Sequence, residues 1–290
     1  MKSILVTGSN GQLGNEIKIL GNDYRNIEFF FHDVDTLDLT DYPLLEDFFY
    51  KHKPDYVINC AAYTAVDKAE KEKEQAFMIN AEVPGKLAEL SKKYMTKLIH
   101  ISTDYVFDGK NYRPYKEDDV PDPISVYGKS KFEGENRILD HNNAVIIRTS
   151  WLYSAFGNNF VKTILKLGKE KKELGIVFDQ IGSPTYAGDL ASAILQIISS
   201  SIADEKNYLP GIYHYANEGV CSWYDLAVEI IRVAGLDCKI NPVETWEYPL
   251  PAKRPLYSVL NKNKIKSTFK LDIPHWKDSL TLFLKAYAHK

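Results

Sequence analysis

The sequence predicts an α/β fold: a doubly wound parallel sheet of the Rossmann type, with a smaller α/β portion toward the C-terminus. Strand-like and helix-like segments alternate through the first half of the 290-residue chain. The strand-like segments are unbroken apolar runs, as expected for strands that helices cover on both faces. The first of them leads through a glycine-rich turn into a helix. This order of elements is typical of doubly wound parallel sheets.

Each element follows from a local pattern of apolar residues. Short apolar runs predict strands over residues 3–7, 27–32, 56–61, 97–102 and 144–151. Helical periodicity between them predicts helices over residues 12–20, 43–51 and 73–94, and one that begins near Tyr127. In the second half, where Pro and Gly are frequent, helices are expected over 190–199, 222–234 and 276–288. We predict one domain over residues 1–151, to which the chain returns around 179–200, and a second portion over 152–290.

Composition excludes several classes of protein. The formal net charge is −3, which gives no general attraction to nucleic acid or to an anionic membrane. No apolar stretch approaches the length of a membrane span. The three cysteines, Cys60, Cys221 and Cys238, are scattered without a CxxC pair, which argues against a disulfide framework or a zinc site. We therefore expect a cytoplasmic protein with no nucleic-acid or membrane partner.

The glycine-rich turn "VTGSNGQLG" is the first candidate binding site. Gly8, Gly11 and Gly14 follow the first strand directly and precede a helix. Such a turn lets the backbone approach a pyrophosphate, while the helix N-terminus offers free N–H groups. A tight turn without a ligand would need similar glycines, but the strand–turn–helix context favours a dinucleotide.

An acidic residue at the end of the second strand bears on the choice of cofactor. In "HDVDTLDLTD", Asp33 is the first candidate to accept hydrogen bonds from the adenosine ribose, and Asp35 is the alternative. A helix-capping role is the other interpretation of such an aspartate. No arginine follows the glycines where it would signal a 2′-phosphate. The pattern therefore favours NADH and leaves NADPH open.

Three side chains form the candidate catalytic group. "LIHISTDYVFDG" is a strand that ends in a hydroxyl residue, Thr103, and Tyr127 and Lys131 lie four positions apart on the next expected helix. Reduction of a ketone by a nicotinamide needs a proton, and a free tyrosine with a pKa of about 10 gives one up poorly at neutral pH. A nearby ammonium stabilises the phenolate and lowers that pKa. The order of the three residues favours catalysis over a surface pair.

These motifs resemble those of the extended short-chain dehydrogenase/reductase superfamily, and within it the dTDP-4-dehydrorhamnose reductase family. "AAYTAVDKAE", "STDYVFDG", "VYGKSKFEGE", "IIRTSWLY", "GNNFVKT", "DQIGSPT" and "PAKRP" occur in the order seen in that family and cover the chain to about Pro255. The resemblance implies NAD(P)H-dependent reduction of the 4-keto group of dTDP-4-dehydro-L-rhamnose. It implies that the first domain binds NAD(P) and that the second mainly binds the sugar nucleotide.

The resemblance also assigns roles to individual residues. Tyr127 would be the proton donor, tuned by Thr103 and assisted by Lys131. Both Tyr127 and Lys131 would also contact the cofactor. Arg254 would bind the diphosphate, although an arginine in a proline-rich loop is equally an ordinary surface residue, and Trp151 is equally a core residue. The other expected cofactor contacts are Gly8, Gly11, Gln12, Leu13, Gly14, Asp33, Asp38, Leu39, Ala62, Tyr63, Thr64 and Ile101. The expected substrate contacts are Thr103, Asp104, Trp151, Asn159, Gln180 and Arg254.

Metal binding and assembly are less well defined by the sequence. Some members of the family dimerise around a magnesium ion held by carboxylates, and Glu16 is placed to be one ligand. The segment after "GSPT" has no glutamate where a second ligand is expected, although Asp189 lies one position further on. We therefore predict no metal and either a monomer or a homodimer. Two rival interpretations are another sugar-nucleotide epimerase, dehydratase or ketoreductase, and a regulatory subunit that binds NADP without turnover.

Overall fold

A six-stranded sheet forms the centre of the molecule in a computed structural model that describes residues 1–141 and 143–288. Every neighbouring pair of its strands is parallel, in the order β10-β5-β4-β3-β1-β2. This arrangement confirms the predicted fold class. The strands are β1 (Lys2–Thr7), β2 (Ile27–His32), β3 (Tyr56–Asn59), β4 (Lys97–Thr103), β5 (Ala144–Thr149) and β10 (Gly211–His214).

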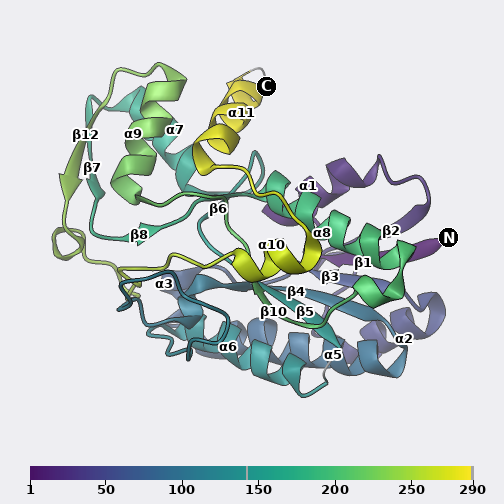
Figure 1. The fold of residues 1–290 in the computed structure, drawn as a ribbon. Helices are drawn as coiled ribbons and strands as arrows, with labels where there is room; N and C mark the ends of the chain where they lie inside the picture. Colours follow the sequence, from purple (N-terminus) through teal and green to yellow (C-terminus); the bar gives the residue numbers. More distant parts are fainter. Residues whose placement is uncertain (142, 289–290) are drawn as a thin grey trace.

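Helices cover both faces of this sheet (Figure 1). The central strands contribute fully buried apolar side chains to two cores, one on each face. This burial explains why their sequences do not alternate. One face packs on α2 (Tyr42–His52), α5 (Val83–Lys93) and α6 (Val126–Leu139), and the other on α1 (Gln12–Gly21), α8 (Ala187–Ala203) and α10 (Asn263–Phe269).

The single helix expected over residues 73–94 is interrupted. It consists of α4 (Lys73–Phe77), a π-helical turn η1 (Met78–Glu82) and α5. Pro84 supplies the reason, because a proline inside a helix cannot donate to the carbonyl four residues earlier and its ring collides with that carbonyl. Widening the turn around Asn80 relieves the collision.

Two expected strands end early, and both ends lie beside the site described below. β3 stops at Asn59 because that side chain accepts the Ala61 N–H (3.2 Å) and turns the chain. β5 stops at Thr149, because Ser150 donates its hydroxyl to the Ser183 carbonyl (2.7 Å) and Trp151 adopts a positive φ of 48°.

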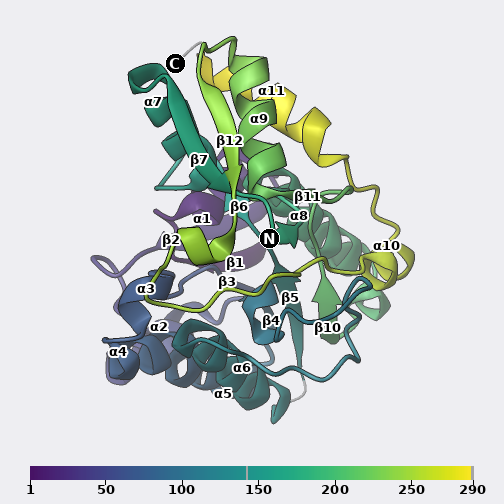
Figure 2. The same ribbon diagram turned by 90° about the vertical axis from the view of Figure 1, so that its left-hand side faces the viewer.

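The C-terminal portion forms a second layer of helices and short strands beside the sheet edge (Figure 2). The expected helix over 276–288 is α11 (Trp276–Ala288). The one over 222–234 is α9 (Trp223–Ala234), which Ser222 caps, and the one over 190–199 lies inside α8. The remaining elements of the C-terminal portion are α7 (Phe160–Glu170), β6 (Leu152–Tyr153), β7 (Glu173–Val177), β8 (Ile181–Gly182), β9 (Thr185–Tyr186), β11 (Cys221–Ser222), β12 (Lys239–Val243) and the turn η4 (Thr245–Glu247). Elsewhere lie α3 (Val66–Ala69), η2 (Asp104–Val106) and η3 (Glu205–Asn207).

Helix α7 and strand β10 were not expected from the sequence. α8 packs beside α1 and β10 adds a sixth strand next to β5, so the chain rejoins the large sheet after residue 186. The division into domains at residue 151 stays a prediction. Among the described residues, no helix has the length and apolar character needed to span a bilayer.

Candidate active site

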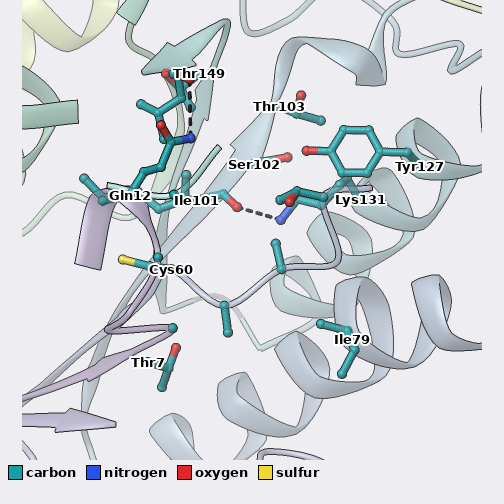
Figure 3. A pocket seen from close by; sticks show the side chains of 18 of the residues that line it. Thr7, Gln12, Cys60, Ile79, Ile101, Ser102, Thr103, Tyr127, Lys131 and Thr149 are labelled. Carbon is teal, nitrogen blue, oxygen red and sulfur yellow. Dashed lines mark hydrogen bonds between the residues drawn. The ribbon is translucent and has the colours of Figure 1, made fainter. Parts of the chain in front are cut away.

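A cavity of about 760 Å³ lies at the C-terminal edge of the sheet. Parallel strands bring their ends to one edge, so residues that follow β1, β3, β4 and β5 face one another there. Thr7, Cys60, Thr103 and Thr149 line it from those four strands (Figure 3). Residues from α6 and from the C-terminal portion complete the wall.

The glycine turn forms one end of the cavity and fits a bound phosphate group. A Cβ on Gly8, whose φ is +62°, would lie 2.7 Å from the Ala61 nitrogen. One on Gly14 would lie 2.5 Å from the Gly8 oxygen. Gly8, Gly11, Gln12 and Leu13 line the cavity, while Gly14 is packed behind the turn. The bare backbone at the start of α1 is what close approach to a pyrophosphate requires.

Acidic side chains at the end of β2 lie beside this turn. Asp33 Oδ2 accepts the Asn10 N–H (2.8 Å) and so ties the end of β2 to the glycine turn. Asp33, Asp38 and Leu39 line the cavity, whereas Asp35 is exposed and outside its wall. The described residues that form this end of the cavity fit the ribose and adenine of a dinucleotide.

Thr103, Tyr127 and Lys131 lie together in one wall of the cavity (Figure 3). The Tyr127 phenol lies near the Thr103 hydroxyl, which donates to Asp104 Oδ1 (3.0 Å). Burial raises the pKa of Tyr127 to about 12, and the neighbouring Thr103 hydroxyl only partly opposes the rise. Burial lowers the pKa of Lys131 to about 8, and its Nζ donates to the Ile101 carbonyl (2.7 Å). The expected lowering of the phenol pKa by Lys131 is therefore absent in the protein alone, where desolvation raises that pKa.

Asp104 is the other charged group of this region. Its side chain is buried, and burial raises the pKa of its carboxyl to about 6, against hydrogen bonds from Ser258 and Thr103. Thr103 Oγ1 donates to Oδ1 (3.0 Å), and Oδ2 has no partner among the described residues. Asp104 thus lines the cavity and carries a buried oxygen that accepts no hydrogen bond.

A buried ion pair supports the wall from behind. Arg148 Nη2 donates to Glu135 Oε2 (2.6 Å), and both side chains are at most 1 % exposed. Ser102 donates its hydroxyl to the same carboxylate. Because these residues come from β5, α6 and β4, the pair fixes the helix that carries Tyr127 and Lys131 against the sheet.

Several residues expected at the site lie outside the cavity wall. The Tyr63 hydroxyl donates to Glu72, and its backbone N–H donates to Asn80 Oδ1 (2.9 Å). Asn159 caps α7 and donates to Gln12 Oε1 (2.9 Å), so it supports a residue that does line the cavity. The neighbours Ala62 and Thr64 line it directly, as do Ile101, Asp104 and Trp151.

Gln180 and Arg254 are also engaged elsewhere. Gln180 is buried and donates to Thr245 Oγ1 (3.0 Å). Arg254 makes a bidentate pair with Asp67, with its Nη2 2.8 Å from Oδ2. Asp67 directly follows Val66, which lines the cavity, so Arg254 lies next to its rim.

Trp223 was not expected at the site. Its ring stacks on that of Trp151, with centroids 3.6 Å apart and planes 9° from parallel, and both line the cavity. Ile79 and Val83, which flank Asn80 around the π-helical turn, line it as well. The sequence marks these residues only as helical, and no short-range signal places them beside Tyr127.

The carboxylates considered for a metal have protein partners. Glu16 bonds to Tyr186, and Asp189 Oδ2 accepts from Asn217 (2.6 Å) and Ser279 (2.5 Å). Within residues 1–141 and 143–288, no three His, Cys, Asp or Glu side chains are grouped to hold a metal ion.

Comparison with known proteins identifies the family. The model described as the RmlD substrate binding domain matches residues 1–289. The dTDP-4-dehydrorhamnose reductase of Aggregatibacter actinomycetemcomitans is 41 % identical over 99 % of this chain and 100 % of that protein. The crystal structure of a dTDP-4-dehydrorhamnose reductase from Clostridium acetobutylicum has a TM-score of 0.92 at 46 % identity, over 99 % of each chain.

A second solved structure was determined with a ligand. The dTDP-4-dehydrorhamnose reductase of Bacillus anthracis, in complex with NADP, has a TM-score of 0.93 at 40 % identity and covers 99 % of this chain and 100 % of its own. These matches extend over essentially the whole chain in both sequence and structure. The chain therefore belongs to the RmlD family of dTDP-4-dehydrorhamnose reductases.

Proposed function

We propose that this protein is an NAD(P)H-dependent reductase that converts dTDP-4-dehydro-L-rhamnose to dTDP-L-rhamnose. One observation carries the proposal: a tyrosine, a threonine and a buried lysine lie together in the wall of a cavity that also contains the glycine turn. The names of the relatives support the substrate, and the NADP complex of one of them supports the cofactor.

The cofactor would lie along the glycine turn, with its adenosine toward Asp33, Asp38 and Leu39. Ala62, Thr64 and Ile101 would then face the nicotinamide half, with Tyr63 behind them. When bound, the nicotinamide supplies the hydride. Asp33 already accepts the Asn10 N–H, and its carboxylate has further lone pairs for ribose hydroxyls. This arrangement is compatible with NADH and NADPH alike.

Tyr127 would protonate the oxygen that develops negative charge at C4 of the sugar. Thr103 would hold the carbonyl oxygen in reach of the phenol and orient it, by turning its hydroxyl hydrogen from Asp104 Oδ1 to that oxygen. Lys131 would stabilise the phenolate that remains. Because the phenol pKa is about 12 in the protein alone, the positive charge that arrives with the oxidised cofactor would have to offset burial.

The sugar nucleotide would occupy the remaining end of the cavity. Asp104 and Trp151 line that end, with Asn159 and Gln180 behind its wall. Arg254 would exchange the Asp67 carboxylate for the diphosphate, since both match a planar guanidinium in the same bidentate way. We retain a monomer or a homodimer as the expected assembly.

The decisive experiment follows NAD(P)H absorbance with enzymatically generated dTDP-4-dehydro-L-rhamnose. Tyr127→Phe should lose turnover by about two orders of magnitude or more, because general-acid catalysis contributes on that scale. Its affinity for NADPH should be retained. Tyr112→Phe is the matched control, since that side chain is 91 % exposed and should not affect the rate.

Each other outcome has a separate meaning. Near-normal turnover by Tyr127→Phe would remove the assigned proton donor. Wild-type protein that binds NADPH but oxidises none with this substrate would favour another keto-sugar nucleotide. If other keto-sugar nucleotides also failed, a regulatory subunit would be favoured.

A further inference from the structure

A chain of buried polar side chains runs across the sheet to the candidate catalytic lysine. Thr7, Asn59, His100 and Lys131 come from β1, β3, β4 and α6, and each is at most 1 % exposed. Thr7 Oγ1 donates to Asn59 Oδ1 (2.7 Å), and Asn59 Nδ2 lies 3.0 Å from His100 Nδ1. His100 Nε2 in turn lies 3.4 Å from Lys131 Nζ.

The orientation of the Asn59 amide follows from its partners. The Ala61 backbone N–H donates to Asn59 Oδ1 (3.2 Å), and a backbone N–H can only donate. Oδ1 is therefore the acceptor side, and the NH₂ group must face His100. Reversing the amide would set two donors against each other at Ala61, so the orientation is fixed by the turn that ends β3.

This orientation selects the tautomer of His100. Burial and the charge of Lys131 hold the pKa of His100 well below its ordinary value, so the ring is neutral. A neutral imidazole has one donor nitrogen and one acceptor nitrogen. Nδ1 accepts from the Asn59 amide, so Nε2 carries the hydrogen, and that hydrogen points toward Lys131.

The hydrogen on Nε2 favours one protonation state of Lys131. An ammonium group has three donors and no lone pair, so it would set a donor against the Nε2–H. A neutral amine can accept that hydrogen while still donating to the Ile101 carbonyl, 2.7 Å away. The His100 Nε2–H thus offers Lys131 a donor, and the Ile101 carbonyl offers it an acceptor.

The other titratable groups near Nζ do not reverse this preference. Glu135, one turn along α6, would favour the ammonium, but Arg148 and Ser102 already bond to its carboxylate. Burial raises the pKa of the Cys60 thiol, which leaves it uncharged. Tyr127 is likewise neutral before proton transfer.

We propose that His100, held by Asn59 as the Nε2–H tautomer, is a positioning residue that stabilises the neutral amine of Lys131. The role rests on the proposed reductase function. After Tyr127 has given its proton to the substrate, the phenolate has to be reprotonated. Lys131 supplies that proton: an N–H bond breaks, a phenol O–H bond forms, and the lysine is left as the amine that His100 stabilises. Solvent then returns the proton to the amine.

Two substitutions reverse the direction of the hydrogen bond to Lys131. Asn59→Asp replaces the amide donor by a carboxylate, which requires hydrogen on Nδ1 and leaves a lone pair on Nε2 facing Nζ. His100→Gln adds no charge and can present its carbonyl oxygen to Nζ. Both should raise the pKa of Lys131 by about one unit or more, a tenfold change in the ratio of ammonium to amine. Thr7→Val keeps the Ala61 bond to Asn59, so it should leave that pKa as in the wild type.

The first measurement does not depend on turnover. Lysine labelled with ¹³C at Cε reports the pKa of Lys131 by NMR titration, and the signal is assigned by its loss in Lys131→Met. Histidine ¹⁵N shifts report the tautomer of His100. An Nδ1–H tautomer in the wild type, or an unchanged Lys131 pKa in both Asn59→Asp and His100→Gln, would overturn the proposal.

The second measurement tests whether the reaction uses this contact. The basic limb of the kcat–pH profile should move upward in Asn59→Asp and His100→Gln by the same amount as the Lys131 pKa. A limb that stays in place while the pKa moves would refute the role in proton supply. If the wild type does not turn over but the NMR shifts occur, the hydrogen-bond arrangement stands and the proposed function fails.

Discussion

Asp104→Asn should make the protein more stable at neutral pH. The Asp104 carboxyl is buried, and desolvation raises its pKa from 3.8 to about 6. Between these two values the folded protein holds a proton that the unfolded chain has released. The contribution of the protonated Asp104 carboxyl to the stability of the fold is therefore fully present below pH 3.8. It is lost as the pH rises through 6.

The size of the effect follows from that shift. About two pKa units correspond to roughly 3 kcal/mol of destabilisation at pH 7. An asparagine keeps the acceptor for Thr103 and carries no charge, so it escapes this penalty. Any cost of its own unpaired NH₂ group does not change with pH.

Urea unfolding of wild type and Asp104→Asn over a series of pH values measures the difference. The advantage of the variant should shrink by about 2 kcal/mol between pH 7 and pH 4.5, according to the linkage relation. Asp108→Asn is a control of opposite sign, because hydrogen bonds from Lys110 and Tyr115 outweigh burial and lower the pKa of Asp108. Parallel stability curves for wild type and Asp104→Asn would refute the reasoning.

Three further predictions concern the buried ion pair, a glycine in close contact and the stacked indoles. Arg148→Met leaves the Glu135 carboxylate buried and unpaired and should cost about 3–5 kcal/mol in urea unfolding, most of which Arg148→Met with Glu135→Leu should recover; equal losses in both would contradict it. Gly134→Ala would place a Cβ 2.0 Å from the Asn80 carbonyl oxygen and should cost about 1–3 kcal/mol, whereas Gly85→Ala meets only the Arg137 side chain and should be close to neutral; equal Tm values would rule this out. Trp223→Ala removes the ring that stacks on Trp151 and should raise KM for the dTDP-sugar by about 3- to 10-fold, with NADPH affinity unchanged; an unchanged KM would refute that.

The parallel sheet was predictable because its signals are local. Each of its first five strands is an apolar run bounded by turn residues, and Gly8 stands directly after the first of them. Burial on both faces demands unbroken apolar sequence, so the pattern admits few alternatives. β10 gave no comparable signal, since Gly211–His214 is not an unbroken apolar run and its place depends on pairing with β5.

The residues of the candidate site also divide into those that local sequence signals predict and those that only the fold brings together. Thr103, Tyr127 and Lys131 could be predicted because a strand end and one helical turn bring them together. Trp223 could not, because only the packing of α9 against the C-terminal layer brings its ring onto Trp151. The Asp67 partner of Arg254, 187 positions away, is equally invisible in the sequence. His100 was hidden for another reason: an apolar strand does not show which of its polar residues has a buried partner.

The stacked indoles of Trp151 and Trp223 make the protein its own optical sensor. The chain has four tryptophans, and these two line the cavity. Emission from an indole depends on its solvent contact and on rings packed against it, so a molecule that enters the cavity alters the light from half of the emitters at once. Reduced nicotinamide absorbs where tryptophan emits. Energy transfer to it would therefore distinguish cofactor binding from sugar binding by the wavelength of emission. Ligands can thus be ranked on unlabelled protein before any turnover is observed.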